Sequence, residues 1–139
     1  AAMAALYHDA PEILTGDLPT PVKYFSSEIS EAYKTVEAAA CQSLLDLLPA
    51  DLREDYTPYL LPADHYPRYL PYLKAADRFS ALVKCMEETR QGNFEFRRAA
   101  AQTREAITAM ALPEADCFLQ DFIPAFEKTL DELQTQEEL

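Results

Sequence analysis

The chain has 139 residues, of which 49% are hydrophobic and 26% are charged, so it contains enough apolar material for the core of one folded domain. Its 24 acidic residues outnumber its 12 basic residues, which gives a formal net charge of −12. Binding of polymeric nucleic acid through the phosphate backbone needs a surplus of lysine and arginine, so we do not expect it here. A small phosphate substrate remains compatible with this charge, because a bound divalent cation can reverse the local field.

The composition favours an all-helical domain over residues 1–139. Only two glycines occur, Gly16 and Gly92, which disfavours a β-sandwich or a glycine-rich nucleotide fold. Alanine, leucine, glutamate and glutamine recur in long runs and favour helices. The three cysteines have no CxxC spacing, which argues against a thiolate zinc site and favours a reduced, cytoplasmic protein. The sequence shows no apolar run long enough to cross a membrane and no recognisable signal peptide.

The chain begins with AAMAAL, which is apolar and lacks an N-cap residue, so residues 1–9 are predicted to be the end of a helix. We therefore expect a fragment whose N-terminal part is missing, although the sequence does not separate this from a chain that simply begins there. Pro11 should interrupt the helix, and TGDLPTP, residues 15–21, predicts a loop.

Longer helices are predicted from the apolar spacing further along the chain. One begins after Ser26 or Ser27, either of which can serve as the N-cap, and runs to about Leu48. Five prolines then predict an irregular connection with short helical turns. The remaining predicted helices cover residues 69–91, residues 94–111 after a stop at Gly92-Asn93, and residues 114–133 with a kink at Pro124.

A possible metal site lies at the end of the first helix, where His8, one of only two histidines, is directly followed by Asp9. Divalent metals in enzymes favour imidazole nitrogen together with carboxylate oxygen, so the pair is a candidate for two ligands of one ion. The alternative is a helix-end histidine beside an ordinary solvated carboxylate. Glu12 follows one turn later, where a carboxylate can hold or deprotonate a water, although its spacing alone favours a surface charge.

Asp77 is a third candidate ligand, because it lies in YLKAADRFSAL at or near the apolar face of a predicted helix. Carboxylates are rarely buried unless they are paired or bound to metal. The alternative is an ion pair with Lys74 or Arg78. Lys23, just after the predicted loop, could contact a phosphate, although a lysine in such a position is usually solvated.

The sequence around these residues resembles that of a known enzyme family. The pattern HDxxE, here residues 8–12, followed by an aspartate in a distant helix, resembles the HD-domain metal-dependent phosphohydrolases. The longer stretches HDAPEILTGDLPTPVKYF and KAADRFSALVKCMEE, with FIPAFEKTLDEL near the end, resemble the bacterial 5′-deoxynucleotidases of the YfbR type. The resemblance implies an all-α HD-domain helical bundle, a homodimer, and hydrolysis of deoxyribonucleoside 5′-monophosphates with one divalent ion such as cobalt, manganese or copper.

The resemblance also implies roles for individual residues. His8, Asp9 and Asp77 match metal ligands, and Glu12 matches the acid that activates an attacking metal-bound water. The segment that contacts the nucleotide is matched by Asp17, Leu18, Pro19 and Thr20.

The chain departs from the family pattern in one respect. A further histidine ligand and an Arg-Trp pair are expected upstream of the HD pair, but the chain has no tryptophan and no histidine before His8. His65 lies in the proline-rich connection and is a poor substitute. We expect the absent elements to fall before Ala1, so that the bundle lacks its N-terminal helices here. If the chain is complete, the metal site lacks a ligand.

Two alternative functions stay open. One is an HD-domain phosphohydrolase that acts on another nucleotide, and the other is a catalytically inactive helical module that binds a nucleotide. The segment DLPT, residues 17–20, argues for a monophosphate substrate. Glu12 argues for catalysis, because a module that only binds a ligand does not need a water-activating acid.

Overall fold

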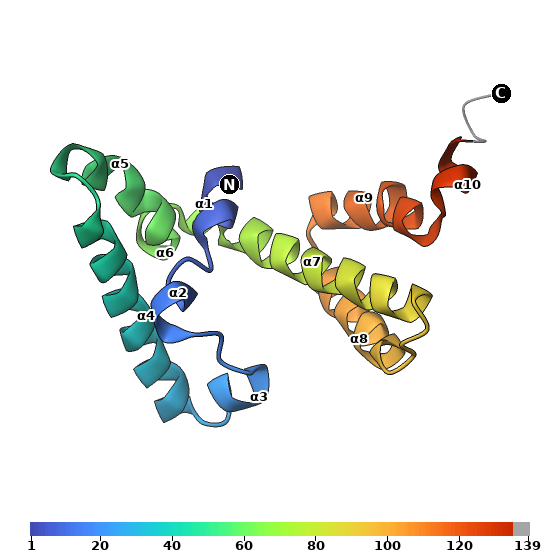
Figure 1. The fold of residues 1–139 in the computed structure, drawn as a ribbon, viewed down its shortest axis with the longest axis horizontal. Helices are drawn as coiled ribbons and strands as arrows, with labels where there is room; N and C mark the ends of the chain where they lie inside the picture. The colour runs from blue at the N-terminus through green and yellow to red at the C-terminus, as the bar shows by residue number, and fades with distance from the viewer. Residues whose placement is uncertain (135–139) are drawn as a thin grey trace. The chain divides into compact units, whose positions relative to one another are not determined.

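The structure is a computed structural model that describes residues 1–134. All of the elements in these residues are helical, and no strand occurs among them, which confirms the all-α prediction. The chain divides into two compact units, one comprising Ala1–Leu73 and the other beginning at Lys74 (Figure 1). The expectation of a single domain over residues 1–139 stays a prediction.

The first unit is built around one long helix, α4 (Ser27–Leu47), against which the short helices α2 and α3 pack (Figure 1). The Ser26 hydroxyl accepts a hydrogen bond from the Ile29 N–H at 3.3 Å, so of the two predicted candidates it is Ser26 that caps α4. The other elements of the unit, apart from the start of α7, are α1 (Ala2–Tyr7), α2 (Glu12–Thr15), α3 (Thr20–Lys23), α5 (Ala50–Leu60), α6 (Pro62–His65) and η1 (Pro67–Tyr69).

The core of the first unit is small and consists mainly of aliphatic side chains. Helix α5 packs against both α1 and α4. The buried residues of the unit are Ala4, Pro11, Ala40, Cys41, Leu45, Leu60 and Leu73. The Cys41 thiol donates a hydrogen bond to the Leu60 carbonyl at 3.2 Å, and burial raises the pKa of this thiol. No disulfide involves any of the three cysteines.

The second unit is formed by α7 (Leu70–Arg90) from Lys74 onward, α8 (Phe96–Thr108), α9 (Pro113–Asp121), η2 (Ile123–Glu127) and α10 (Leu130–Gln134). Its core consists of Ala75, Leu82, Ile107, Ala115 and Ile123. The guanidinium of Arg78 donates a hydrogen bond to the Ala106 carbonyl at 2.7 Å, which ties α7 to α8.

Two predicted segments differ from the structure. The connection after Leu48 contains the eleven-residue helix α5, because Pro58 lies only two residues before its end and removes a single backbone hydrogen bond. The helix predicted over residues 114–133 is wrong, since α9 ends at Asp121 and a 3-10 segment follows. Pro124 lies at the start of that segment, where its missing N–H ends the helix instead of kinking it.

None of the helices within residues 1–134 is both long enough and apolar enough to cross a membrane.

The second unit should depend strongly on Ile107, which is 0% exposed. Ile107→Ala is expected to lower the free energy of unfolding by about 3 kcal/mol, because truncation removes buried methyl groups and leaves a cavity. Ile13→Ala is the matched control, since Ile13 is 77% exposed and should lose less than about 0.5 kcal/mol. Urea denaturation followed by circular dichroism measures both values, and equal losses would contradict this description of the core.

Candidate active site

His8 lies at the C-terminal end of α1, and its ring is held by the backbone of that helix. Its Nδ1 atom is 2.7 Å from the Ala5 carbonyl oxygen. A carbonyl oxygen only accepts, so Nδ1 must carry a hydrogen and donate it. Metal-binding histidines commonly donate one ring N–H in this way, which fixes the tautomer and leaves the other nitrogen for the ion.

Asp9 adds a carboxylate next to the remaining ring nitrogen. The distance from His8 Nε2 to Asp9 Oδ1 is 3.1 Å, and the two side chains are 34% and 61% exposed. Because Nδ1 already donates its hydrogen, a neutral ring presents a lone pair to the carboxylate at this distance. The contact is favourable when a proton or a metal ion satisfies both atoms. The pair therefore has the chemistry of two donors for one cation, with a protonated ring as the metal-free alternative.

Glu12 begins α2 and belongs to the same turn of the chain as the His-Asp pair. Its N–H donates to the Asp9 carbonyl at 2.9 Å, and buried Pro11 holds the intervening backbone. Burial raises the pKa of the Glu12 carboxyl, and the negative charges of Asp9 and Asp17 raise it further, partly offset by Lys23. A raised pKa makes Glu12 a stronger proton acceptor than an ordinary surface carboxylate.

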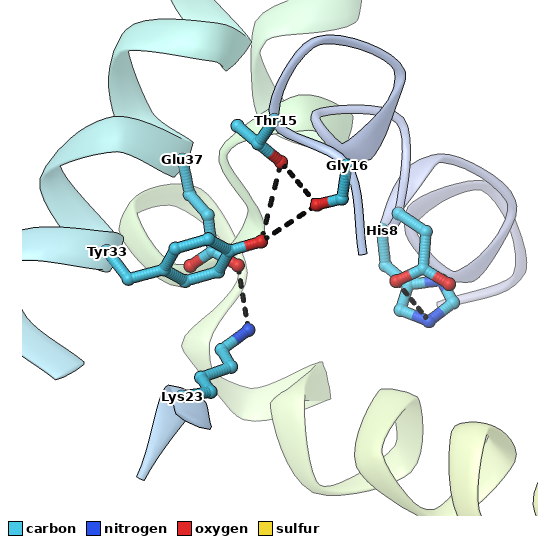
Figure 2. A network of polar contacts seen from close by, with 7 residues as sticks. His8, Thr15, Gly16, Lys23, Tyr33 and Glu37 are labelled. Carbon is cyan, nitrogen blue, oxygen red and sulfur yellow. Dashed lines mark hydrogen bonds and ion pairs between the residues drawn. The ribbon is translucent and has the colours of Figure 1, made fainter. Parts of the chain in front are cut away.

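Gly16 opens the segment that was predicted to contact the nucleotide. Its backbone, with φ 69° and ψ 160°, adopts a conformation that is essentially restricted to glycine. Its carbonyl oxygen accepts hydrogen bonds from the hydroxyls of Thr15 at 3.0 Å and Tyr33 at 3.2 Å (Figure 2). These contacts fix the start of the segment to α4.

A second anchor holds the other end of the same segment. The ammonium of Lys23, at the end of α3, pairs with the Glu37 carboxylate at 2.8 Å and lies 4.7 Å from the centre of the Tyr33 ring (Figure 2). Burial lowers the pKa of the Lys23 ammonium, but the hydrogen bond and charge of Glu37 outweigh it and raise that pKa above its usual value. Lys23 is thus engaged with α4, which differs from the solvated lysine that the sequence favoured.

The predicted substrate segment lies between these two anchors. Asp17 and Pro19 are exposed, Leu18 is half-buried, and Thr20 begins α3. The sequence analysis did not identify Tyr33 and Glu37, which lie one helical turn apart on α4 and hold both ends of the segment. Their spacing of four residues would have placed them on one face of the helix, but nothing local indicates what that face contacts.

Asp77 lies on α7 in the second unit, whereas His8, Asp9 and Glu12 belong to the first. Its side chain is exposed instead of buried, which differs from the expectation. Among the described residues, neither Lys74 nor Arg78 forms an ion pair with it, and Arg78 is bonded to the Ala106 carbonyl instead. The proposed alternative of a buried ion pair is therefore not found.

The structure thus gathers only part of the predicted site. His8 and Asp9 are in contact, and Glu12 follows within one turn of the chain, with the segment from Asp17 to Thr20 close behind in the sequence. In the part of the chain that the structure describes, no three His, Cys, Asp or Glu side chains form a group that could hold a metal ion. His65, at the end of α6, is exposed.

An all-helical fold with an adjacent His-Asp pair at the end of one helix and a glutamate at the start of the next has the features of the HD-domain phosphohydrolases. Comparison with known proteins defines the family more closely. A family model described as 5′-deoxynucleotidase YfbR-like matches residues 1–126, and the chain belongs to this family.

Curated relatives support the same assignment. A 5′-deoxynucleotidase of Vibrio cholerae is 46% identical over 132 residues, which are 95% of this chain and 68% of that protein. A 5′-deoxynucleotidase of Vibrio atlanticus is 43% identical over the same shares. The 5′-deoxynucleotidase YfbR of Escherichia coli is 41% identical over 95% of this chain and 66% of its own length.

Tyr33→Phe is expected to lower the free energy of unfolding by about 1 kcal/mol, because the Gly16 carbonyl loses the hydroxyl that anchors it to α4. Tyr24→Phe is the matched control, since Tyr24 is 68% exposed and its hydroxyl makes no hydrogen bond to a carbonyl within residues 1–134. Urea denaturation of both variants measures the difference. If the two substitutions have the same effect, the hydroxyl of Tyr33 does not anchor the segment.

Proposed function

We propose that the protein is a metal-dependent phosphomonoesterase that removes the 5′-phosphate from deoxyribonucleoside 5′-monophosphates. Membership of the YfbR-like family supports this activity, and the relatives described above are named 5′-deoxynucleotidases. The observation that carries the proposal is the oriented His8 ring, whose Nε2 lies 3.1 Å from Asp9 Oδ1 with Glu12 one turn away.

The donor atoms suit a divalent cation. His8 Nε2 and the Asp9 carboxylate would hold it, and imidazole combined with carboxylate is compatible with cobalt, manganese or copper. Asp77 is proposed as a further ligand on the resemblance of its stretch, KAADRFSALVKCMEE, alone. A bound divalent cation supplies two effects, a lowered pKa of water and neutralisation of charge on phosphate oxygens.

Glu12 is proposed to act as the general base. As water attacks phosphorus, Glu12 takes one of its protons, and the bond from phosphorus to the 5′-oxygen breaks. Glu12 then releases this proton to solvent and the leaving oxygen takes up a proton from solvent, so the products are a deoxynucleoside and inorganic phosphate. The burial and neighbouring charges that raise the pKa of Glu12 strengthen it as an acceptor, which is the property this step needs.

The segment from Asp17 to Thr20 is proposed to hold the nucleotide. The backbone N–H groups of Asp17 and Leu18 have no acceptor among residues 1–134, so they are free to donate to a ligand. Leu18 and Pro19 offer apolar surface for a sugar or base. The two anchors on α4 limit the movement of this segment, so less conformational entropy is lost when a substrate binds.

The resemblance also supports assembly as a homodimer, and the reduced cysteines support a cytoplasmic location. The homodimer and the cytoplasmic location are proposed here, as the identity of the metal is.

Phosphate release from deoxyadenosine 5′-monophosphate in the presence of Co²⁺ tests the proposed activity. Glu12→Gln is expected to lower kcat by about 10² to 10⁴, because it removes the base and keeps the side-chain shape. Glu54→Gln is the matched control on α5, where the side chain is exposed, and it should retain activity within about twofold.

Two outcomes would contradict the proposal. Full activity of Glu12→Gln would show that another group takes the proton. Release of phosphate from nucleoside triphosphates or cyclic nucleotides, with none from deoxynucleoside monophosphates, would instead support one of the other phosphohydrolases.

A further inference from the structure

The second unit contains a hollow of about 410 Å³ that the proposed hydrolase chemistry does not use. It is lined by residues of α7, α8, the connection between them and η2. Its apolar surface includes Met86, Phe94 and Phe126. The two aromatic side chains are 58% and 44% exposed, so a part of each ring is free of protein contacts. A volume of this size matches a small organic ligand.

The charge around the hollow is opposite to that of the whole chain. Arg90, Arg97 and Arg104 all line it, whereas Glu127 is its single carboxylate, in a protein with a formal net charge of −12. Arg104 pairs with Glu127 at 3.5 Å, which neutralises that carboxylate. The local charge therefore favours an anion.

The other two arginines retain capacity to bind a ligand. Arg90 donates to the Lys128 carbonyl at 3.3 Å through one nitrogen, which leaves most of its five N–H donors unused. The guanidinium of Arg97 lies 4.2 Å from the centre of the Phe94 ring, so its plane is supported by a cation–π contact. Among the described residues, Arg97 has no carboxylate partner. A stacked guanidinium without such a partner is well placed to bind an anionic group.

The hollow lies away from the candidate metal ligand on the same helix. Asp77 and Arg90 are thirteen residues apart on α7, which corresponds to about 20 Å along the helix axis. A ligand at Arg90 and Arg97 is therefore not a ligand of a metal ion at Asp77.

We propose that this hollow binds a small organic anion with a flat aromatic body. The anionic group lies against Arg97 and Arg90, and the aromatic body lies between Phe94, Phe126 and Met86. A ligand of this chemistry obtains binding free energy from both the guanidinium groups and the exposed rings. An inorganic anion obtains it only from the guanidinium groups. The proposal does not depend on the nucleotidase activity.

Naphthalene-2-sulfonate is a suitable probe, because it has the aromatic body and the anionic group and cannot be hydrolysed by a phosphomonoesterase. Isothermal titration calorimetry on the metal-free protein should show one site. Arg97→Gln is expected to weaken binding about tenfold or more, because it removes a charged hydrogen-bond donor. Arg98→Gln is the matched control, since it removes the same charge from the next residue, which does not line the hollow. It should change the affinity less than twofold.

Further measurements distinguish a ligand site in the hollow from binding at the candidate active site and from a contact between two copies. Glu12→Gln should bind the probe as tightly as the unaltered protein, and sodium sulfate should not compete at the same concentration. Phe126→Ala should also weaken binding, which provides a test if Arg97→Gln does not fold. Absence of binding, or equal effects of Arg97→Gln and Arg98→Gln, would overturn the proposal. So would a change in protomer association on Arg97→Gln without any probe binding, because the hollow would then be an interface between two copies.

Discussion

The hydrogen bond from His8 Nδ1 to the Ala5 carbonyl determines how the candidate ligands of the N-terminal turn are oriented. The last carbonyl groups of a helix have no partner within it, and here the histidine that follows α1 supplies one. The ring orientation and tautomer are thereby set by the helix itself. Nε2 is directed to the Asp9 carboxylate, and the next turn begins with Glu12. The candidate site thus depends on where α1 ends. Pro11 disfavours helical backbone just before it, so the helix ends ahead of this proline.

The segment that we propose to hold the nucleotide depends on a different constraint, its attachment to α4. Four residues separate Tyr33 from Glu37, so one face of α4 holds both the Gly16 carbonyl and the Lys23 ammonium. The segment between these contacts is short and starts with a backbone conformation that only glycine adopts readily. A loop fixed at both ends presents its free N–H groups in a limited range of positions. This property suits a binding segment better than a connection that is free to move.

Local signals predicted much of this arrangement. The cap at Ser26, the stop at Gly92 and the His8-Asp9 pair each involve residues whose effect is local, and the sequence identified them. The roles of Tyr33 and Glu37 were not predictable, because their partners lie seventeen and fourteen residues away in the chain. Pro124 shows the limit of local rules, since a proline either kinks or ends a helix according to the packing around it. The exposure of Asp77 likewise depends on which elements surround α7, and the spacing of apolar residues does not determine this.

The two histidines of the chain allow a direct test of the proposal that His8 and Asp9 hold one cation. Co²⁺ is titrated into the protein while the imidazole signals of His8 and His65 are followed by NMR. We expect the first equivalent to shift and broaden the His8 signals, with the hydrogen retained on Nδ1. His65 should remain unchanged, and Asp9→Asn should weaken the effect on His8. Equal changes at both histidines, or none at His8, would contradict the account.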